Sequence, residues 1–227
     1  MPGKLYVVAT PIGNLTDLSE RAKETLSKVD AILCEDTRVT SKLLAVIAVE
    51  KPLIAFHQYS DEKRTRELIE RLRDGQTLAL VTDAGTPGIS DPGGKLVEAV
   101  VDAFGNDANI IPIPGPNAAV AALSVSGFPA DRFTFLGFPP HKKGRQTYFK
   151  ELSAMEETLV FYESTHRVLK CLEEMAALEE LKERPLVVCR ELTKLHETIY
   201  RGTAAQVTAR LKETSIRGEF VIVVAPA

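Results

Sequence analysis

The sequence is poor in cysteine and contains no long apolar run. Its three cysteines, Cys34, Cys171 and Cys189, form no Cys-x-x-Cys pair, which argues against a zinc site and a disulfide framework and favours a reducing compartment. No segment approaches the roughly 18 consecutive apolar residues of a membrane span. The apolar run near the N-terminus is too short for a signal peptide. We therefore expect a cytoplasmic protein that does not bind a membrane.

Charge of neither sign predominates, because 28 Lys and Arg stand against 31 Asp and Glu for a net charge of −3. This balance excludes a uniformly basic surface for nucleic acid but leaves room for a local basic patch. The 44% apolar and 26% charged residues are typical of a globular protein. A length of 227 residues predicts one or two domains.

Two glycine motifs of nucleotide-binding sites are also missing. The turn after the first predicted strand, residues 10–15, reads Thr-Pro-Ile-Gly-Asn-Leu and has one glycine instead of Gly-x-Gly-x-x-Gly. The chain contains no Walker A motif. Ordinary dinucleotide and nucleoside triphosphate sites are therefore disfavoured.

In the first half of the chain, short apolar runs alternate with helical patterns. The predicted strands are Leu5–Ala9, Ala31–Cys34, Leu53–Phe56, Thr77–Val81 and Asn109–Ile113. Strands separated by helices predict an α/β fold with a parallel sheet and helices on both faces. Asp17 and Glu20 read as the N-cap and the capping-box partner of the first helix.

The pattern changes around Gly115, where Pro112, Pro114 and Pro116 interrupt it. We therefore predict two domains, residues 1–114 and 115–227. The second half has strands near 133–136, 158–162, 186–189, 198–200 and 220–224, and helices near 117–123, 165–178 and 204–212. A short connection before residue 198 predicts a hairpin, and hence a mixed sheet with helices.

The segment Thr82–Gly94 is rich in glycine and follows a predicted parallel strand. Open α/β sheets bind ligands at the carboxyl ends of their strands, and glycine lets backbone approach a ligand closely. Asp83 and Asp91 are candidate hydrogen-bond acceptors for that ligand. The alternative is a long turn into a helix, with Ser90 or Asp91 near the helix N-terminus.

Polar or turn-rich segments follow other predicted strands as well. In the first half they are residues 34–38, 56–59 and 114–118, and in the second half residues 163–167 and 190–197. Gathered on one edge of the first sheet, the first-half segments describe a cleft, and Glu163, His166 and Arg167 are candidates to line it from the second domain. The alternatives are a loop salt bridge between Asp36 and Arg38, a helix cap at Ser164 or Thr165, and a charged hairpin turn over residues 190–197.

The segment Arg132–Lys150 contains five basic residues, no acidic residue and several aromatic residues. Basic groups neutralise phosphates and aromatic rings stack on bases, so the segment is a candidate nucleic-acid-binding surface. We expect an exposed, mobile loop over residues 139–144. The alternative is a basic surface loop between core aromatics.

Several segments occur in an order that is typical of one family. They are residues 10–15, 35–38, 82–94, 114–118, 161–164, 190–197 and 218–223. Together they resemble the bacterial 16S ribosomal RNA ribose 2′-O-methyltransferases, which belong to the tetrapyrrole-methylase-like superfamily. The resemblance covers nearly the whole chain, although Thr165 stands where the family pattern has proline.

The resemblance implies an enzyme of two α/β domains that binds S-adenosylmethionine between them and methylates the 2′-hydroxyl of a decoding-centre cytidine. It also implies a homodimer whose partner is 16S rRNA or the small ribosomal subunit, not DNA. The implied cofactor-binding residues are Pro11, Asp83, Ala84, Gly85, Thr86, Ile89, Ser90, Asn117, Ala118, Tyr162, Leu192 and Glu219.

A ribose hydroxyl is a poor nucleophile, so a general base would help the transfer. Glu163 is the first hypothesis for this base and Asp36 the alternative. The expected RNA contacts are Arg38, Lys142, Lys143, Arg145, Arg167 and Lys194. Two other functions remain open. One is methylation of a small tetrapyrrole-like substrate, against which the basic aromatic segment argues. The other is a non-catalytic RNA- or ribosome-binding protein, against which the intact cofactor segments argue.

Overall fold

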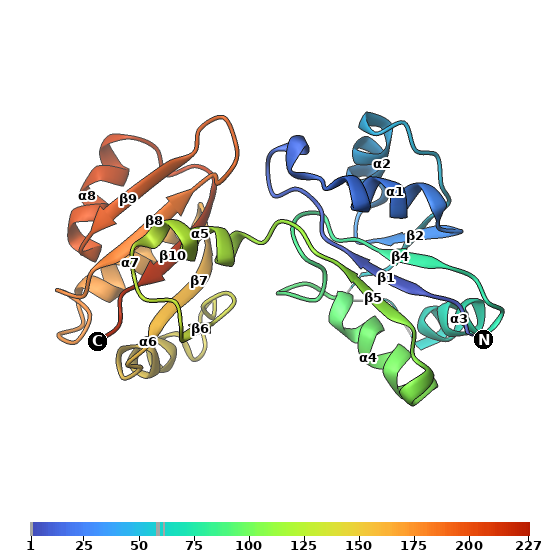
Figure 1. Ribbon diagram of the computed structural model, residues 1–227. Coiled ribbons are helices and arrows are strands. Elements are labelled where there is room, and N and C mark those ends of the chain that lie inside the picture. The colour runs from blue at the N-terminus through green and yellow to red at the C-terminus, as the bar shows by residue number, and fades with distance from the viewer. Residues whose placement is uncertain (1, 58–59, 61) are drawn as a thin grey trace. The chain divides into compact units, whose positions relative to one another are not determined.

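The first half of the chain forms the predicted parallel sheet, whose five strands lie in the order β3-β2-β4-β1-β5 (Figure 1). This computed structural model describes residues 2–57, 60 and 62–227. The strands are Leu5–Val8 (β1), Ala31–Cys34 (β2), Leu53–Ala55 (β3), Leu78–Leu80 (β4) and Ile110–Ile113 (β5). The strands β2 and β4 read as unbroken apolar runs because helices cover both faces of the sheet.

Two helices cover each face of this sheet (Figure 1). The helices are Glu20–Lys28 (α1), Thr37–Val46 (α2), Glu62–Arg73 (α3) and Gly93–Phe104 (α4), and the 3-10 turns are Leu15–Asp17 (η1) and Gly105–Asp107 (η2). Leu26 of α1 and Leu44 of α2 pack on one face, whereas Leu68 of α3 and Leu96 of α4 pack on the other.

The neighbouring strands β1 and β4 therefore lead to opposite faces of the sheet. β1 continues into α1, and β4 continues into α4. Such a pair of adjacent strands opens a crevice at its carboxyl end, and this switch point is where open α/β sheets bind ligands. The glycine-rich segment 82–94 and the turn after β1 both begin there.

The second half forms a five-stranded mixed sheet in the order β6-β7-β10-β8-β9, which confirms the predicted fold class. Its strands are Phe133–Phe135 (β6), Thr158–Ser164 (β7), Leu186–Arg190 (β8), Thr198–Gly202 (β9) and Glu219–Val224 (β10), and its helices are Ala118–Ser126 (α5), Arg145–Ser153 (α6), Val168–Ala176 (α7) and Ala204–Glu213 (α8). Only β6 and β7 pair in parallel. Helix α5 covers one face, and α6, α7 and α8 cover the other (Figure 1).

The chain divides into two units, residues 1–117 and 118–227. The boundary predicted from the prolines lies three residues before this division. None of the helices in the described ranges has the length and the apolar character that a bilayer crossing requires.

Two local expectations were wrong. Helix α1 is capped by Ser19, whose Oγ accepts the N–H of Ala22 at 3.1 Å, and Asp17 instead ends the turn η1. No helix was expected over residues 145–153, where α6 follows Gly144, a residue with φ of +82°. The basic side chains of α6 obscure the apolar positions, Phe149 and Leu152, that it buries.

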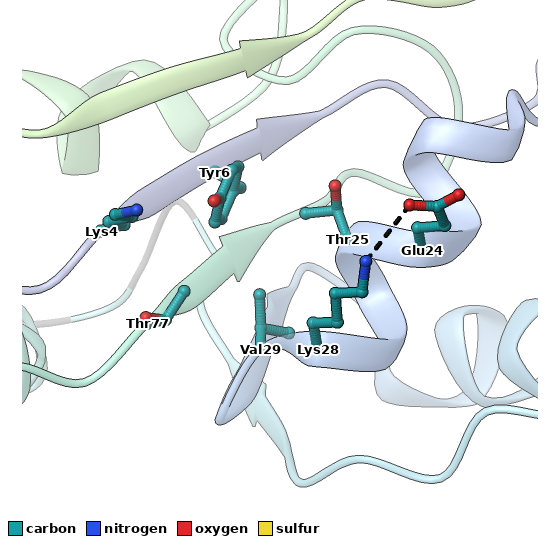
Figure 2. A pocket seen from close by; sticks show the side chains of 7 residues that line it. All are labelled: Lys4, Tyr6, Glu24, Thr25, Lys28, Val29 and Thr77. Carbon is teal, nitrogen blue, oxygen red and sulfur yellow. Dashed lines mark hydrogen bonds and ion pairs between the residues drawn. The ribbon is translucent and has the colours of Figure 1, made fainter.

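A hollow of about 320 Å³ lies at the opposite, amino-terminal edge of the first sheet (Figure 2). It is lined by Lys4, Tyr6, Glu24, Thr25, Lys28, Val29 and Thr77. Lys28 forms an ion pair with Glu24 at 3.2 Å across α1. The hollow contains no predicted site residue and lies away from the switch point.

Candidate functional site

The glycine-rich segment is fastened to the turn after β1 by backbone hydrogen bonds. The N–H of Thr10 donates to the carbonyl of Gly85 at 2.9 Å, and the N–H of Gly85 donates to the carbonyl of Thr10 at 3.1 Å. The buried Thr10 hydroxyl donates to the carbonyl of Thr82 at 3.1 Å. These bonds bring the loops after β1 and β4 together at the switch point, with half-buried Pro11 beside them.

The same segment runs through left-handed backbone conformations. Gly85 and Gly88 have φ of +87° and +86°, which only glycine adopts without cost. Ser90 has φ of +61°, an uncommon conformation for a residue with a side chain and one that clusters at binding sites. Ala84, Ile89 and Ser90 are exposed, so this backbone is accessible to a ligand.

Asp91 holds this loop in place. Its carboxylate accepts the N–H of Gly88 at 2.8 Å and the N–H of Gly93, the first residue of α4, at 2.7 Å. Asp91 therefore lies at the start of α4, as the alternative interpretation held. Its carboxylate oxygens accept backbone N–H groups of the protein.

The loop after β5 contacts the loops after β1 and β4. The Thr86 hydroxyl donates to the carbonyl of Pro116 at 3.0 Å, next to the predicted site residues Asn117 and Ala118. Gly115 passes so close to Ala9 that a Cβ on it would lie 3.0 Å from the Ala9 Cβ. The structure thus brings the predicted residues of the first unit together around the carboxyl ends of β1, β4 and β5.

The carboxyl end of β2 adds acidic groups to this edge. The exposed Asp83 carboxylate accepts the N–H of Asp36 at 3.1 Å and so connects the loops after β4 and β2. Asp36 caps α2 by accepting the N–H of Arg38 at 2.8 Å and also pairs with the Arg38 side chain. Hydrogen bonds from Arg38 lower the pKa of Asp36 to about 2. Asp36 is therefore a weak base.

Glu35, the neighbour of Asp36, behaves in the opposite way. Partial burial, followed by the nearby charges of Asp83 and Asp91, raises the pKa of its carboxyl above the usual range. A carboxylate with a raised pKa accepts a proton more readily. Glu35 is not among the predicted site residues, although it lies in the same segment as Asp36 and Arg38.

In the second unit, Tyr162 lies half-buried on β7 between aromatic neighbours. Its ring packs edge-on against Phe135, with centroids 5.1 Å apart, and against Phe138, with centroids 5.3 Å apart. Burial raises the pKa of the Tyr162 phenol, which is hydrogen-bonded to the backbone of Ala119 in α5. Phe138 is 51% exposed, so it presents an open aromatic ring that the sequence alone did not distinguish from its neighbours.

The loop after β8 is held by an acidic pair. Lys194 contacts Glu191 at 3.0 Å and Glu219 at 2.7 Å. Burial opposes its charge, but hydrogen bonds with Glu219 and Glu191 raise the pKa of Lys194. Two carboxylates thus neutralise this predicted RNA contact, and Leu192 lies half-buried in the same loop.

Glu163, the first hypothesis for the general base, is buried inside the second unit. Its side chain is 0% exposed, and Oε1 lies 2.9 Å from Nε of Arg167. Nη1 of Arg145 lies 3.6 Å from its other oxygen. This carboxylate therefore does not present itself to a substrate hydroxyl.

The predicted RNA contacts separate into exposed and engaged side chains. Lys142 and Lys143 are exposed at the surface of the second unit. Arg38 is 86% exposed but is paired with Asp36. Arg145 is only 4% exposed, and its Nε and Nη1 donate to Glu174 and to the carbonyl of Pro140, so the expectation that it contacts RNA needs correction.

Arg167 is also largely withdrawn from solvent, with its side chain 15% exposed. Basic residues usually lie at the surface, and sequence alone therefore predicts exposure for Arg145 and Arg167. Pairing with a buried acidic residue allows both to be buried instead. The segment 56–59, singled out after β3, has residues 58 and 59 outside the described residues.

Comparison with known proteins agrees with this architecture. The profile of the Tetrapyrrole (Corrin/Porphyrin) Methylases matches residues 4–208. The uroporphyrin-III C-methyl transferase of Thermus thermophilus, solved in complex with S-adenosyl homocysteine, superposes with a TM-score of 0.66 at 17% identity. That match covers 98% of this chain and 97% of the other. At this identity the likeness concerns the fold.

Closer relatives are named Ribosomal RNA small subunit methyltransferase I. The protein of Synechocystis sp. is 47% identical over 99% of this chain and 80% of its own length. The protein of Escherichia coli O157:H7 is 45% identical over 98% of this chain and 77% of its own length. The chain therefore belongs to the tetrapyrrole methylase family of S-adenosylmethionine-dependent methyltransferases, in the same branch as these relatives.

Proposed function

We propose that this methyltransferase acts on 16S rRNA and methylates the ribose 2′-hydroxyl of a decoding-centre cytidine. The observation that carries the proposal is the exposed basic and aromatic surface of the second unit, formed by Lys142, Lys143 and Phe138. Cations neutralise phosphates and an open aromatic ring stacks on a base. A small tetrapyrrole-like substrate would favour an apolar pocket, whereas this surface presents the charged side chains of Lys142 and Lys143.

The carboxyl edge of the first sheet fits S-adenosylmethionine. The cofactor supplies an electrophilic methyl group on a sulfonium cation. The exposed residues of this segment, Asp83, Ala84 and Gly88–Ser90, offer backbone polar groups, and Ile89, 44% exposed, offers apolar contact for an adenine. The carboxylates of Glu35, Asp83 and Asp91 make this edge negative, which favours a cationic ligand.

The residues that would hold the cofactor are those grouped at this edge and their proposed partners in the second unit. They are Pro11, Asp83, Ala84, Gly85, Thr86, Ile89, Ser90 and Asn117 in the first unit, and Ala118, Tyr162, Leu192 and Glu219 in the second unit. Thr10, Thr86 and Asp91 set the conformation of the glycine-rich loop by hydrogen bonds, so the loop is prepared before the ligand arrives.

Proton removal from the ribose hydroxyl is best assigned to Glu35 among the carboxylates considered. Its pKa is raised, whereas the pKa of Asp36 is lowered to about 2 and Glu163 is buried. Asp36 would instead orient Arg38, whose exposed guanidinium is suited to a phosphate. We expect the enzyme to act as a homodimer in the cytoplasm, where its ribosomal substrate is assembled.

The test is transfer of labelled methyl groups from S-adenosylmethionine to small ribosomal subunits that lack ribose methylation, with mapping of the product by mass spectrometry. We expect a 2′-O-methyl group on one decoding-centre cytidine. Methylation of a base, or of a tetrapyrrole but not of rRNA, would contradict the proposal. Absence of both transfer and S-adenosylmethionine binding would favour a non-catalytic protein.

A further inference from the structure

Glu163 is the centre of a buried charge cluster that the proposed reaction does not use. Its Oε1 accepts the N–H of Ser164 at 2.8 Å and pairs with Nε of Arg167 at 2.9 Å. Its Oε2 lies 3.6 Å from Nη1 of Arg145, and the Glu163 side chain is 0% exposed. Two arginine side chains thus pair with this buried carboxylate, and breaking such a buried pair is strongly destabilising.

Both arginines extend beyond Glu163 to the same short stretch of backbone. Nη1 of Arg167 donates to the carbonyl of Pro139 at 3.1 Å. Nη1 of Arg145 donates to the carbonyl of Pro140 at 3.0 Å. The two guanidinium groups thus join a buried carboxylate on β7 to consecutive carbonyls at the start of the basic loop, residues 139–144.

Arg145 also holds the far end of the basic loop. Gly144 turns the chain with φ of +82°, and Arg145 is the first residue of α6. The Arg145 guanidinium lies 5.0 Å from the ring centroid of Phe149 and bonds Glu174 of α7 at 2.6 Å. The loop is therefore held at both ends, while Lys142 and Lys143 between them remain exposed.

We propose that Glu163 is a positioning residue for RNA: through Arg145 and Arg167 it fixes the basic loop and so holds Lys142 and Lys143 where they meet rRNA phosphates. The proposal rests on the proposed function, in which these lysines contact the substrate. A fixed loop loses less conformational entropy when RNA binds, so the two lysines bind more tightly than on a free loop. Because Glu163 is buried, it does not contact the substrate, but it remains paired with Arg145 and Arg167.

The positioning role and the base role predict different kinetics for Glu163→Gln. Glutamine keeps the shape and the acceptor for Ser164 but removes the charge that holds the two arginines. If Glu163 positions the loop, KM for rRNA rises about tenfold, equivalent to about 1.4 kcal/mol, while kcat and the Kd of S-adenosylmethionine change little. Loss of a general base would instead lower kcat by about 10²- to 10⁴-fold.

A double-mutant cycle makes the test specific to the basic loop. Glu163→Gln is combined with the pair Lys142→Ala and Lys143→Ala, and the Kd for rRNA is measured for each protein. If Glu163 acts through these lysines, its substitution has almost no further effect once they are removed. Additive effects would overturn the proposal. Glu173→Gln, which removes an exposed carboxylate paired with Lys212 at 2.9 Å, is the matched control and should leave Kd unchanged.

Amide hydrogen exchange provides a readout that does not depend on RNA. The N–H groups of Arg145 and Tyr148 donate to the loop carbonyls of Lys142 at 3.4 Å and Gly144 at 2.9 Å, and their exchange should become faster in Glu163→Gln and stay unchanged in Glu173→Gln. Equal exchange in all three proteins would refute the positioning role. If Glu163→Gln does not fold, Arg167→Gln removes the bond to Pro139 at a partly exposed side chain and is measured in the same way. Failure of the wild-type protein to methylate or bind rRNA would refute the proposed function, whereas normal wild-type activity with a kcat defect in Glu163→Gln would refute only this inference.

Discussion

The hydroxyl of Thr165 accepts the N–H of Gly218 at 2.7 Å and donates to the carbonyl of the same residue at 2.6 Å. These bonds connect the turn after β7 with the residue before β10. The proline expected here from the family resemblance carries no hydroxyl and could form neither bond. We expect Thr165→Val to destabilise the protein by about 1–2 kcal/mol, because it leaves the two backbone groups without this partner.

Urea unfolding of Thr165→Val and of the wild type measures this difference. Thr165→Ser retains the hydroxyl and should recover most of the stability. Equal unfolding midpoints for the valine and wild-type proteins would show that the bonds to Gly218 contribute nothing.

Asp91 should act on cofactor affinity through the loop that it holds. Asp91→Ala removes the acceptor of the N–H groups of Gly88 and Gly93. We expect the protein to lose about 1 kcal/mol of stability, as with other lost helix-start acceptors, and S-adenosylmethionine to bind less tightly, as measured by calorimetry. Asp102→Asn, an exposed position on α4, is the control; unchanged affinity in Asp91→Ala would mean that the loop conformation does not matter for the cofactor.

Lys142 and Lys143 should determine the salt dependence of RNA binding. Replacing both by alanine removes two phosphate contacts, so the slope of log K against log salt should decrease by about 1.4–1.8. Filter binding over a range of salt concentrations measures the slope. The exposed pair Lys182→Ala and Lys212→Ala serves as the charge-matched control, and a slope that changes equally in both double variants would contradict a specific contact.

Glu35 should control the acid side of the pH–rate profile. Its pKa is raised above the usual range by burial and by Asp83 and Asp91. The ionised form is the base, so the rate should be present above this pKa and lost as the pH falls through it. We expect Glu35→Gln to lower kcat by about 10²-fold or more and to abolish that acid limb, whereas Asp36→Asn should keep it. An unchanged profile in Glu35→Gln would exclude Glu35 as the base.

The three thiols should not react with thiol reagents in the native protein. Cys34, Cys171 and Cys189 are all buried, and burial raises the pKa of Cys189 to about 11. We expect no reaction with an aromatic disulfide reagent at pH 8 until urea unfolds the chain. Because the folded thiol ionises at higher pH than the unfolded one, its contribution to stability is present below about pH 9 and is lost as the pH rises towards 11. Rapid native labelling would contradict this burial.

Local pattern was sufficient for most of the architecture. The alternation of apolar runs and helical patterns predicts the parallel sheet, because the spacing of apolar residues along the chain distinguishes strands from helices. The helix α6 escaped detection, since its face is defined by packing of Phe149 and Leu152 against the second sheet. The cap of α1 was misplaced because Asp17 and Ser19 both suit a helix start, and only backbone geometry distinguishes them.

By itself the sequence determined the order of the strands, the two-part organisation, the family and the exposed basic loop, because these depend on residue type and spacing along the chain. Only the tertiary structure decided which charged side chains are available for chemistry. Glu163 and Arg145 are buried against each other, whereas Glu35 and Lys142 remain accessible. Burial and pairing depend on contacts between residues distant in the chain, here β7 with α6, and residue type carries no information about such partners.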